Sequence, residues 1–320
     1  MILVTGATGF LGKAVLKHLL ADNQAWRVAV AVRKAGQQWP EKVLPRVMGD
    51  LESYTDWSVA LDDVFAVVHC AARVHVMNDA AIDPLAEFRR INVQGTLNLA
   101  RQAATAGVRR FIFISSIKVN GESTQRGSPF FADGICAPLD PYGVSKMEAE
   151  QGLRDISAQT GMEVVIIRPP LVYGPGVKAN FAAMMRWLKR GIPLPLGAIH
   201  NQRSLVALDN LVDLIVTCLS HPAAANQTFL VSDGEDLSTT QLLRRMGNAL
   251  GKPARLIPVP ASVLKLGAAL VRKPELAQRL CGSLQVDISK TRELLGWRPP
   301  VSVDEGLRRA AEGYLRETVV

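Results

Sequence analysis

Short apolar runs alternate with helical patterns through the first half of the chain. Five of the runs are rich in β-branched residues and apolar on both faces, as in parallel strands covered by helices on both sides. These runs are Ile2–Val4, Val28–Val32, Val64–His69, Phe111–Ile114 and Val164–Ile167. Between them, Lys13–Leu20 carries an apolar stripe and Glu87–Ala104 is rich in helix formers. The alternation predicts an α/β fold with a doubly wound, Rossmann-type parallel sheet.

The second half of the chain has a different pattern. Pro170–Pro195 is rich in Gly and Pro and holds one helical segment, Phe181–Lys189. Leu205–Leu219 is typical of a strand followed by a helix, with Asp209 as the expected N-cap, and Phe229–Val231 predicts a further strand. This pattern indicates a smaller, discontinuous C-terminal domain.

The sharpest change in composition, near residue 170, sets the expected domain boundaries. We expect residues 1–170 to form the NAD(P)-binding domain, with a returning segment near 203–223. Residues 171–202 and 224–320 are expected to form the substrate-binding domain.

Composition and charge limit the classes of binding partner that we expect. The 320 residues are 48% hydrophobic and 21% charged, which is typical of a folded globular protein. The net charge of +8 favours anionic partners such as nucleotides, but the basic residues are scattered and predict no nucleic-acid partner. The apolar stretch Ala261–Val271 contains Lys265 and is about half a membrane span, so we expect a packed helix and no membrane span.

The four cysteines lie more than sixty residues apart, so no CxxC pair or zinc site is expected. They are Cys70, Cys136, Cys218 and Cys281. Together with the lack of a secretory signal at the N-terminus, they predict reduced thiols, a cytoplasmic location and no metal centre.

A glycine-rich segment follows the first strand and opens the first helix. Its spacing is GxxGxxG, and in this context glycines allow the backbone to approach a pyrophosphate at a helix N-terminus. The expected cofactor-binding residues are Gly6, Thr8, Gly9, Phe10, Leu11 and Gly12.

The residues that end the second and third strands bear on the choice of cofactor. Arg33 and Lys34 stand where a fold that prefers NAD places an acidic residue on the ribose. Two cations suit a 2′-phosphate, so NADP(H) is favoured and NAD(H) stays open. Asp50 and Leu51 are expected to contact the adenine.

A Tyr-x-x-x-Lys pair, Tyr142 and Lys146, follows a predicted N-cap at Asp140. The pair shares one helix face, and an ammonium near a phenol favours the phenolate and proton transfer near neutral pH. Ser116 ends the Phe111–Ile114 strand segment, where open α/β sheets bind ligands. We therefore predict Ser116, Tyr142 and Lys146 as the catalytic residues.

Together these motifs make the chain resemble the extended short-chain dehydrogenases/reductases, the NAD(P)-dependent nucleotide-sugar epimerase/dehydratase family, over nearly its whole length. The supporting signatures are His69-Cys70-Ala71-Ala72, Asn92–Thr96, Arg168-Pro169, Val172–Pro175 and Leu295–Pro299.

The resemblance implies roles for further residues. Ala71, Ala72, Asn92 and Pro170 are expected to contact the cofactor. The residues expected to hold the diphosphate of a UDP-sugar are Asn180 and Arg203, with Arg279 as a candidate for a second phosphate contact. A homodimer is usual in the family and is expected here.

Departures from the family pattern narrow the reaction. Ile117-Lys118 replaces the Asp-Glu pair of the 4,6-dehydratases, which argues against dehydration. Asn120 and Leu171 replace a Tyr and an Asn, which argues against UDP-glucose 4-epimerisation. The phrase Ser115–Glu122 is most similar to bacterial O-antigen reductases that form UDP-N-acetylquinovosamine.

We therefore expect NAD(P)H-dependent reduction of the 4-keto group of a UDP-4-keto-6-deoxy-N-acetylhexosamine. One alternative is a UDP-hexose 4-epimerase, acting on UDP-glucose or UDP-N-acetylglucosamine with tightly bound NAD. An alternative of another class is a non-catalytic NADP-sensing protein, although such a protein has no need of Tyr142 and Lys146.

Overall fold

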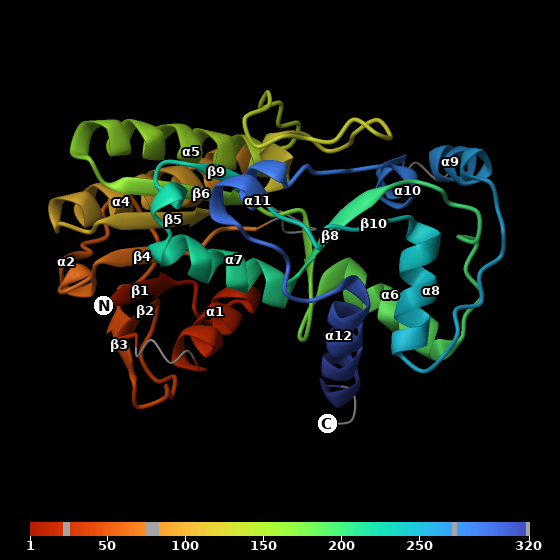
Figure 1. The fold of residues 1–320 in the computed structure, drawn as a ribbon, viewed down its shortest axis with the longest axis horizontal. Helices are drawn as coiled ribbons and strands as arrows, with labels where there is room; N and C mark the ends of the chain where they lie inside the picture. Colours follow the sequence, from red (N-terminus) through yellow and green to blue (C-terminus); the bar gives the residue numbers. More distant parts are fainter. Residues whose placement is uncertain (22–25, 75–82, 271–273, 318–320) are drawn as a thin grey trace.

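The computed structural model describes residues 1–21, 26–74, 83–270 and 274–317. Its centre is a seven-stranded sheet in the order β3-β2-β1-β4-β5-β6-β9, and every neighbouring pair is parallel (Figure 1). The strands are β1 (Ile2–Thr5), β2 (Val28–Val32), β3 (Val43–Val47), β4 (Ala66–His69), β5 (Arg110–Ile114), β6 (Glu163–Arg168) and β9 (Thr228–Leu230). The strand order reverses at β1, so the expected Rossmann-type α/β fold is confirmed.

Helices cover both faces of this sheet (Figure 1). Alternate side chains of β1 show why: Ile2 and Val4 pack in one core with α1 and α7, while Leu3 packs in a second core with α2, α4 and α5. Strands buried on both faces need apolar residues at every position, which is the pattern in the sequence. The helices are α1 (Phe10–Ala21), α2 (Ser58–Leu61), α4 (Thr96–Thr105), α5 (Pro141–Thr160) and α7 (Leu208–Ser220).

The segment predicted as one helix over Glu87–Ala104 contains a change of helix type. It consists of α3 (Pro84–Phe88), a π-helical turn η1 (Arg89–Gly95) and then α4. Gly95 at the end of the turn is required because a Cβ there would lie 2.6 Å from the carbonyl oxygen of Leu51. A π-helical turn re-aims the side chains of one turn, and such turns are frequent at functional sites.

A smaller part with its own core lies beside the carboxyl ends of the strands (Figure 1). Its sheet has the order β10-β8-β7, with β8 parallel to β7 and antiparallel to β10. Its strands and packed helices are β7 (Leu171–Tyr173), β8 (Arg203–Ala207), β10 (Asp236–Leu237), α6 (Ala179–Arg190), α8 (Thr239–Ala249) and α12 (Val303–Glu317). Three further helices are α9 (Ala261–Leu270), α10 (Pro274–Cys281) and α11 (Ser289–Leu295), and the 3-10 turns are η2 (Ile117–Val119) and η3 (Pro222–Ala224).

The chain crosses between the two parts more often than predicted. β9 pairs with β6 in the large sheet, although we assigned residues 224–320 to the smaller domain. α11 also packs on the large part, because Thr291 Oγ1 donates to the Leu230 carbonyl at 2.7 Å and Trp297 Nε1 donates to Asp213 at 2.7 Å. A sequence pattern predicts that a strand forms but not which strand it pairs with. The exact division of the chain into two domains therefore stays a prediction.

Two local predictions are wrong. Asp209 is not the N-cap of α7; Ala207 holds that position, and Asp209 lies in the first turn, paired with Arg309 at 3.1 Å. α9 does form over Ala261–Leu270, but most of its surface is exposed to solvent instead of packed. Within the described residues, no helix combines the length and apolar character that crossing a bilayer requires.

Candidate active site

The glycine segment forms a tight turn between β1 and α1. Gly6 has φ +68°, and a Cβ at this position would lie 2.7 Å from the backbone nitrogen of Ala71. A Cβ on Gly12 would overlap the carbonyl oxygen of Gly6, so both positions require glycine. Thr8 and Gly9 are exposed at the start of the twelve-residue α1. This leaves backbone N–H groups at a helix N-terminus open to an anion such as a pyrophosphate.

A buried histidine, His69, fixes the floor of this turn. Its Nδ1 lies 2.8 Å from Thr5 Oγ1 and its Nε2 lies 3.0 Å from Thr96 Oγ1. Burial, and then the charge of Lys146, lower the pKa of His69 to about 3, so the ring is neutral. The Ala71 N–H in turn donates to Thr5 Oγ1 at 3.2 Å. No role was predicted for Thr5, His69 and Thr96, although His69 and Thr96 both belong to family signatures.

The residues expected at the adenosine end lie together. Arg33 Nη1 is 3.9 Å from Asp50 Oδ1, and both side chains are more than two-thirds exposed. Lys34 is exposed beside them, and Leu51 packs against Gly95. Arg33 therefore faces a carboxylate that offsets part of its charge, which the sequence spacing did not predict.

Tyr142 and Lys146 are presented by the first turns of α5. The predicted N-cap is confirmed, because Asp140 accepts a hydrogen bond from the Gly143 N–H at 2.6 Å. Lys146 is buried; its Nζ donates to the Ile114 carbonyl at 2.8 Å and lies 4.4 Å from the centre of the Phe113 ring. This bond ties α5 to the carboxyl end of β5, two residues before Ser116.

Contacts on either side of Ser116 hold the end of β5 against the start of α5 and the end of β6. Ser116 caps η2 by accepting from the Lys118 N–H at 3.3 Å, and Lys118 forms an ion pair with Asp140. Pro170 is buried at the end of β6, and the neighbouring Pro169 carbonyl accepts from the Ile117 N–H at 3.0 Å. The start of α5 and the ends of β5 and β6 therefore converge on one site.

The pKa directions differ from the sequence-based expectation. Burial lowers the pKa of Lys146 to about 8, while burial and the Asp140 carboxylate raise the pKa of Tyr142 above its usual value. Lys146 Nζ lies 6.0 Å from the centre of the Tyr142 ring, too far to offset these effects in the protein alone. These directions do not reproduce the expected effect of Lys146 on the phenol, and the acid–base role of Tyr142 stays a prediction.

Asn92 lies on the π-helical turn and joins three segments of the site. Its Oδ1 accepts from the Arg73 N–H at 2.8 Å, and its Nδ2 donates to the Arg73 carbonyl at 3.0 Å and to Ser145 Oγ at 3.1 Å. Ser145 Oγ donates to the Tyr142 carbonyl at 2.8 Å. Asn92 thus holds the segment after β4 against the turn that carries Tyr142, and its direct contact with the cofactor stays a prediction.

Behind the site lies a buried charge cluster that the sequence analysis missed. Glu150 is fully buried one turn after Lys146, and it accepts from Ser115 Oγ at 2.6 Å. Arg168 Nε and Nη2 donate to the two Glu150 oxygens at 2.8 and 2.6 Å; Nη2 also donates to Cys136 Sγ, and Nη1 donates to Asn120 Oδ1. Ser115 precedes the catalytic candidate Ser116, so this cluster fixes the backbone that carries it. Its signal in the sequence is the i, i+4 spacing of Glu150 from Lys146.

The candidate phosphate-binding residues lie in the smaller part. Arg203 Nη1 donates to the carbonyls of Arg279 and Gly282 at 3.0 and 3.2 Å, and burial lowers the pKa of Arg203. Among the described residues, Arg203 has no carboxylate partner within ion-pair distance, so its charge is available to an anionic ligand. Arg279 is exposed on the last turn of α10. Asn180 is exposed on the first turn of α6 and is not joined to Arg203 by a contact.

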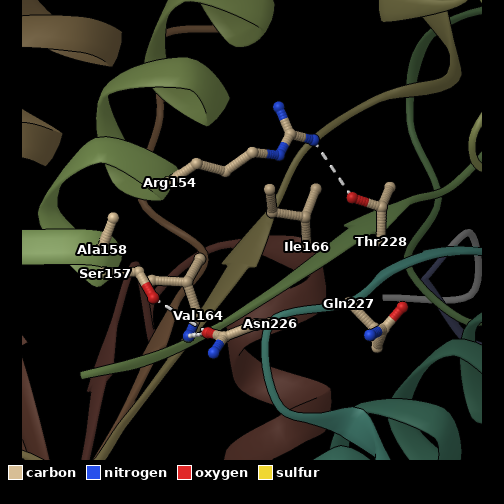
Figure 2. A pocket seen from close by; sticks show the side chains of 8 residues that line it. All are labelled: Arg154, Ser157, Ala158, Val164, Ile166, Asn226, Gln227 and Thr228. Atoms are coloured by element: carbon tan, nitrogen blue, oxygen red, sulfur yellow. Dashed lines mark hydrogen bonds between the residues drawn. The ribbon is translucent and has the colours of Figure 1, made fainter. Parts of the chain in front are cut away.

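A pocket of about 280 Å³ at the far end of α5 lies outside this site. Figure 2 shows that its polar side chains bind one another: Arg154 donates to Thr228 Oγ1 at 3.1 Å and Ser157 Oγ donates to Asn226 at 2.9 Å. These bonds tie α5 to β9 and the segment before it. We therefore assign the pocket a structural role.

The turn at β1 and α1, the strand order and the Tyr-Lys pair on α5, beside the end of β5, define a class. They describe a dinucleotide-binding α/β protein of the short-chain dehydrogenase/reductase type. Comparison with known proteins identifies the family within this class. The family model described as NAD dependent epimerase/dehydratase family matches residues 2–232. The chain belongs to this family.

Individual relatives cover almost the whole chain. A UDP-glucose 4-epimerase of Vibrio cholerae is 51% identical over 98% of this chain and 95% of the relative. An N-acetyl-α-D-glucosaminyl-diphospho-ditrans,octacis-undecaprenol 4-epimerase of Escherichia coli O157:H7 is 26% identical over 97% and 94%. In fold, the crystal structure of UDP-glucuronic acid 4-epimerase from Bacillus cereus, in complex with UDP-glucuronic acid and NAD, matches with a TM-score of 0.78, 23% identity and 99% coverage of both chains.

Proposed function

We propose that the protein is an NAD-dependent UDP-hexose 4-epimerase. The observation that carries the proposal is the 51% identity, over almost the full length, to a UDP-glucose 4-epimerase. The Tyr142–Lys146 pair and the desolvated Arg203 support it, because they fit proton transfer at a sugar hydroxyl and an anionic diphosphate. The 4-keto reductase expected from the sequence phrase Ser115–Glu122 becomes the second candidate.

The two departures that argued against UDP-glucose 4-epimerisation have another explanation. Asn120 is buried, accepts from Arg168 and donates to the Phe131 carbonyl at 3.0 Å. Its amide is thus used to hold the loop after η2 and need not contact substrate. Leu171 is 43% exposed at the start of β7, outside the contacts that fix the catalytic residues. Neither replacement weighs against an epimerase.

The residues present fit a bound dinucleotide. Gly6 and Gly12 leave no room for a side chain at the turn, and the N-terminus of α1 is open to the pyrophosphate. Asp50, with Arg33 beside it, would hold the adenosine end, and Lys146 the nicotinamide ribose. We favour NAD over the NADP(H) expected from Arg33 and Lys34, because Asp50 shares the charge of Arg33. NAD, when bound, supplies the hydride acceptor and returns the hydride.

In the proposed reaction, Tyr142 Oη takes the proton from the sugar 4-hydroxyl and later returns it to the same oxygen. Ser116 Oγ orients that oxygen, and the Lys146 ammonium stabilises negative charge on Tyr142. Arg203 and Arg279 keep the diphosphate in place while the sugar ring turns to present its other face. The site thereby inverts C4 without net oxidation.

The deciding experiment incubates the purified protein with UDP-glucose, and separately with UDP-N-acetylglucosamine, without added cofactor. Chromatography of the products should show the C4 epimer, and acid denaturation should release NAD from the protein. Tyr142→Phe is the control and should retain NAD but form no epimer.

The reductase candidate predicts the opposite pattern. It requires oxidation of added NADH or NADPH, followed at 340 nm, with UDP-4-keto-6-deoxy-N-acetylglucosamine as the substrate. Rapid oxidation in this assay, with no epimer formed from either UDP-sugar, would replace the epimerase assignment.

A further inference from the structure

Helix α9 presents an apolar stripe to solvent. Val263, Leu266 and Leu270 are 54%, 64% and 78% exposed, and their i, i+3, i+7 spacing places them on one helix face. Leu264 packs against the core of the smaller part, so the rotation of the helix about its axis is fixed. Ile257, on the segment leading to α9, is 50% exposed as well. Exposed apolar groups of this kind mark an interaction surface.

The sequence around α9 is rich in cations. From Leu237 to Pro274 it contains seven Lys and Arg residues and no Asp or Glu, and the next acidic residue is Glu275 on α10. Of these, Lys265 on α9 and Arg255 on the preceding segment are exposed. An exposed apolar helix stripe in a segment that carries exposed cations has the composition of a helix that lies in the interface of an anionic membrane.

We propose that α9 docks the protein on the surface of an anionic phospholipid bilayer. Val263, Leu266 and Leu270 enter the acyl boundary, while Lys265 and Arg255 bind lipid phosphates. A second copy of the chain is a poorer occupant, because it would bring the same cations against one another.

The position of α9 links membrane docking to the candidate phosphate-binding residues Arg203 and Arg279. α9 packs against α10, whose last turn carries Arg279 next to Arg203. Docking therefore holds the phosphate-binding side of the smaller part close to the lipid headgroups. The inference does not depend on the reaction proposed above, and it fails or stands separately from it.

Vesicle flotation tests the proposal. The full-length protein is mixed with vesicles of phosphatidylcholine and phosphatidylglycerol at a 7:3 ratio, or of phosphatidylcholine alone, and floated through a sucrose gradient. The test variant is Val263→Ser, Leu266→Ser, Leu270→Ser. The matched control removes three apolar side chains elsewhere that are at least comparably exposed: Tyr54→Ser, Val59→Ser, Ile135→Ser.

We expect wild type and the control variant to float with the anionic vesicles and the α9 variant to bind at least about tenfold more weakly, from lost apolar burial. Arg255→Glu with Lys265→Glu should reduce binding as well, and so should high salt. Turnover of soluble substrate should be unchanged in all variants. Failure of wild type to float, equal binding of the α9 variant, or a loss of dimer in that variant on light scattering without vesicle binding would overturn the proposal.

Discussion

Helices α5 and α9 differ in which side chains they bury: α5 buries charged groups, whereas α9 exposes apolar ones. The charged groups of α5 that face the sheet are buried and hydrogen-bonded, as Glu150 with Arg168 and Lys146 with the Ile114 carbonyl show. α9 keeps its one cation, Lys265, exposed and leaves apolar side chains without partners in the described part of the chain. The fold itself therefore fixes α5, whereas it leaves the apolar stripe of α9 accessible to a partner outside the chain.

The largest effect is expected from the charge cluster of α5. Glu150→Ala leaves the buried Arg168 guanidinium without its counter-charge and should lower the free energy of unfolding by about 3–5 kcal/mol. Glu148→Ala on the same helix breaks a partly exposed pair with Arg89 and should cost about 1 kcal/mol or less. Urea unfolding of both variants measures the difference, and equal losses would contradict a specific role of the buried pair.

Tyr142→Phe removes the proton donor and acceptor without changing the packing against Phe88. We expect turnover to fall by about a hundredfold or more, with the NAD content of the purified protein unchanged. Steady-state kinetics and nucleotide analysis of the denatured protein measure the two quantities. Turnover close to that of wild type would remove Tyr142 from its assigned role.

Lys146→Met should abolish turnover but stabilise the cofactor-free protein at pH 7, by about 1–3 kcal/mol, because an ammonium is no longer buried. The pKa of Lys146, about 8, lies below its ordinary value, so the folded state binds this proton less well than the unfolded state. The destabilisation of the wild-type protein by this ammonium is therefore complete below pH 8, and it disappears as the pH rises toward 10.5. The difference in the free energy of unfolding between wild type and Lys146→Met should therefore be large at pH 7 and small at pH 10. Urea unfolding at the two pH values measures it, and a difference that does not change with pH would contradict the assignment.

The smallest effect is expected at the adenosine end. Arg33→Ala should weaken NADP⁺ about tenfold and leave NAD⁺ within about twofold, since only a 2′-phosphate needs the guanidinium beside Asp50. Arg27→Ala, which breaks an exposed pair with Asp63 near the other end of β2, is the control. Isothermal titration measures both affinities. An equal loss of affinity for the two nucleotides would show that Arg33 does not contact the 2′-phosphate.

Local signals predicted most of the large sheet and the Tyr-Lys pair. Asp140 followed by a proline is a cap with its own geometry, and the strands carry apolar residues on both faces whatever lies around them. The failures needed information from distant residues. The pKa of Tyr142 depends on burial by the whole site, and Arg168 on β6 meets Glu150 on α5 only when that helix packs on the sheet. The exposure of α9 depends on the absence of a neighbour, which an apolar run of sequence cannot report.

The return of the late chain to the large sheet sets the order in which the protein can be completed during synthesis. β9 supplies the last strand only after residue 230 has left the ribosome, and Trp297 reaches Asp213 later still. Until then the nascent chain exposes the edge of β6 and the surface that α11 covers. Residues 1–170 alone therefore form an unfinished sheet with an open edge, which is the kind of intermediate that chaperones bind.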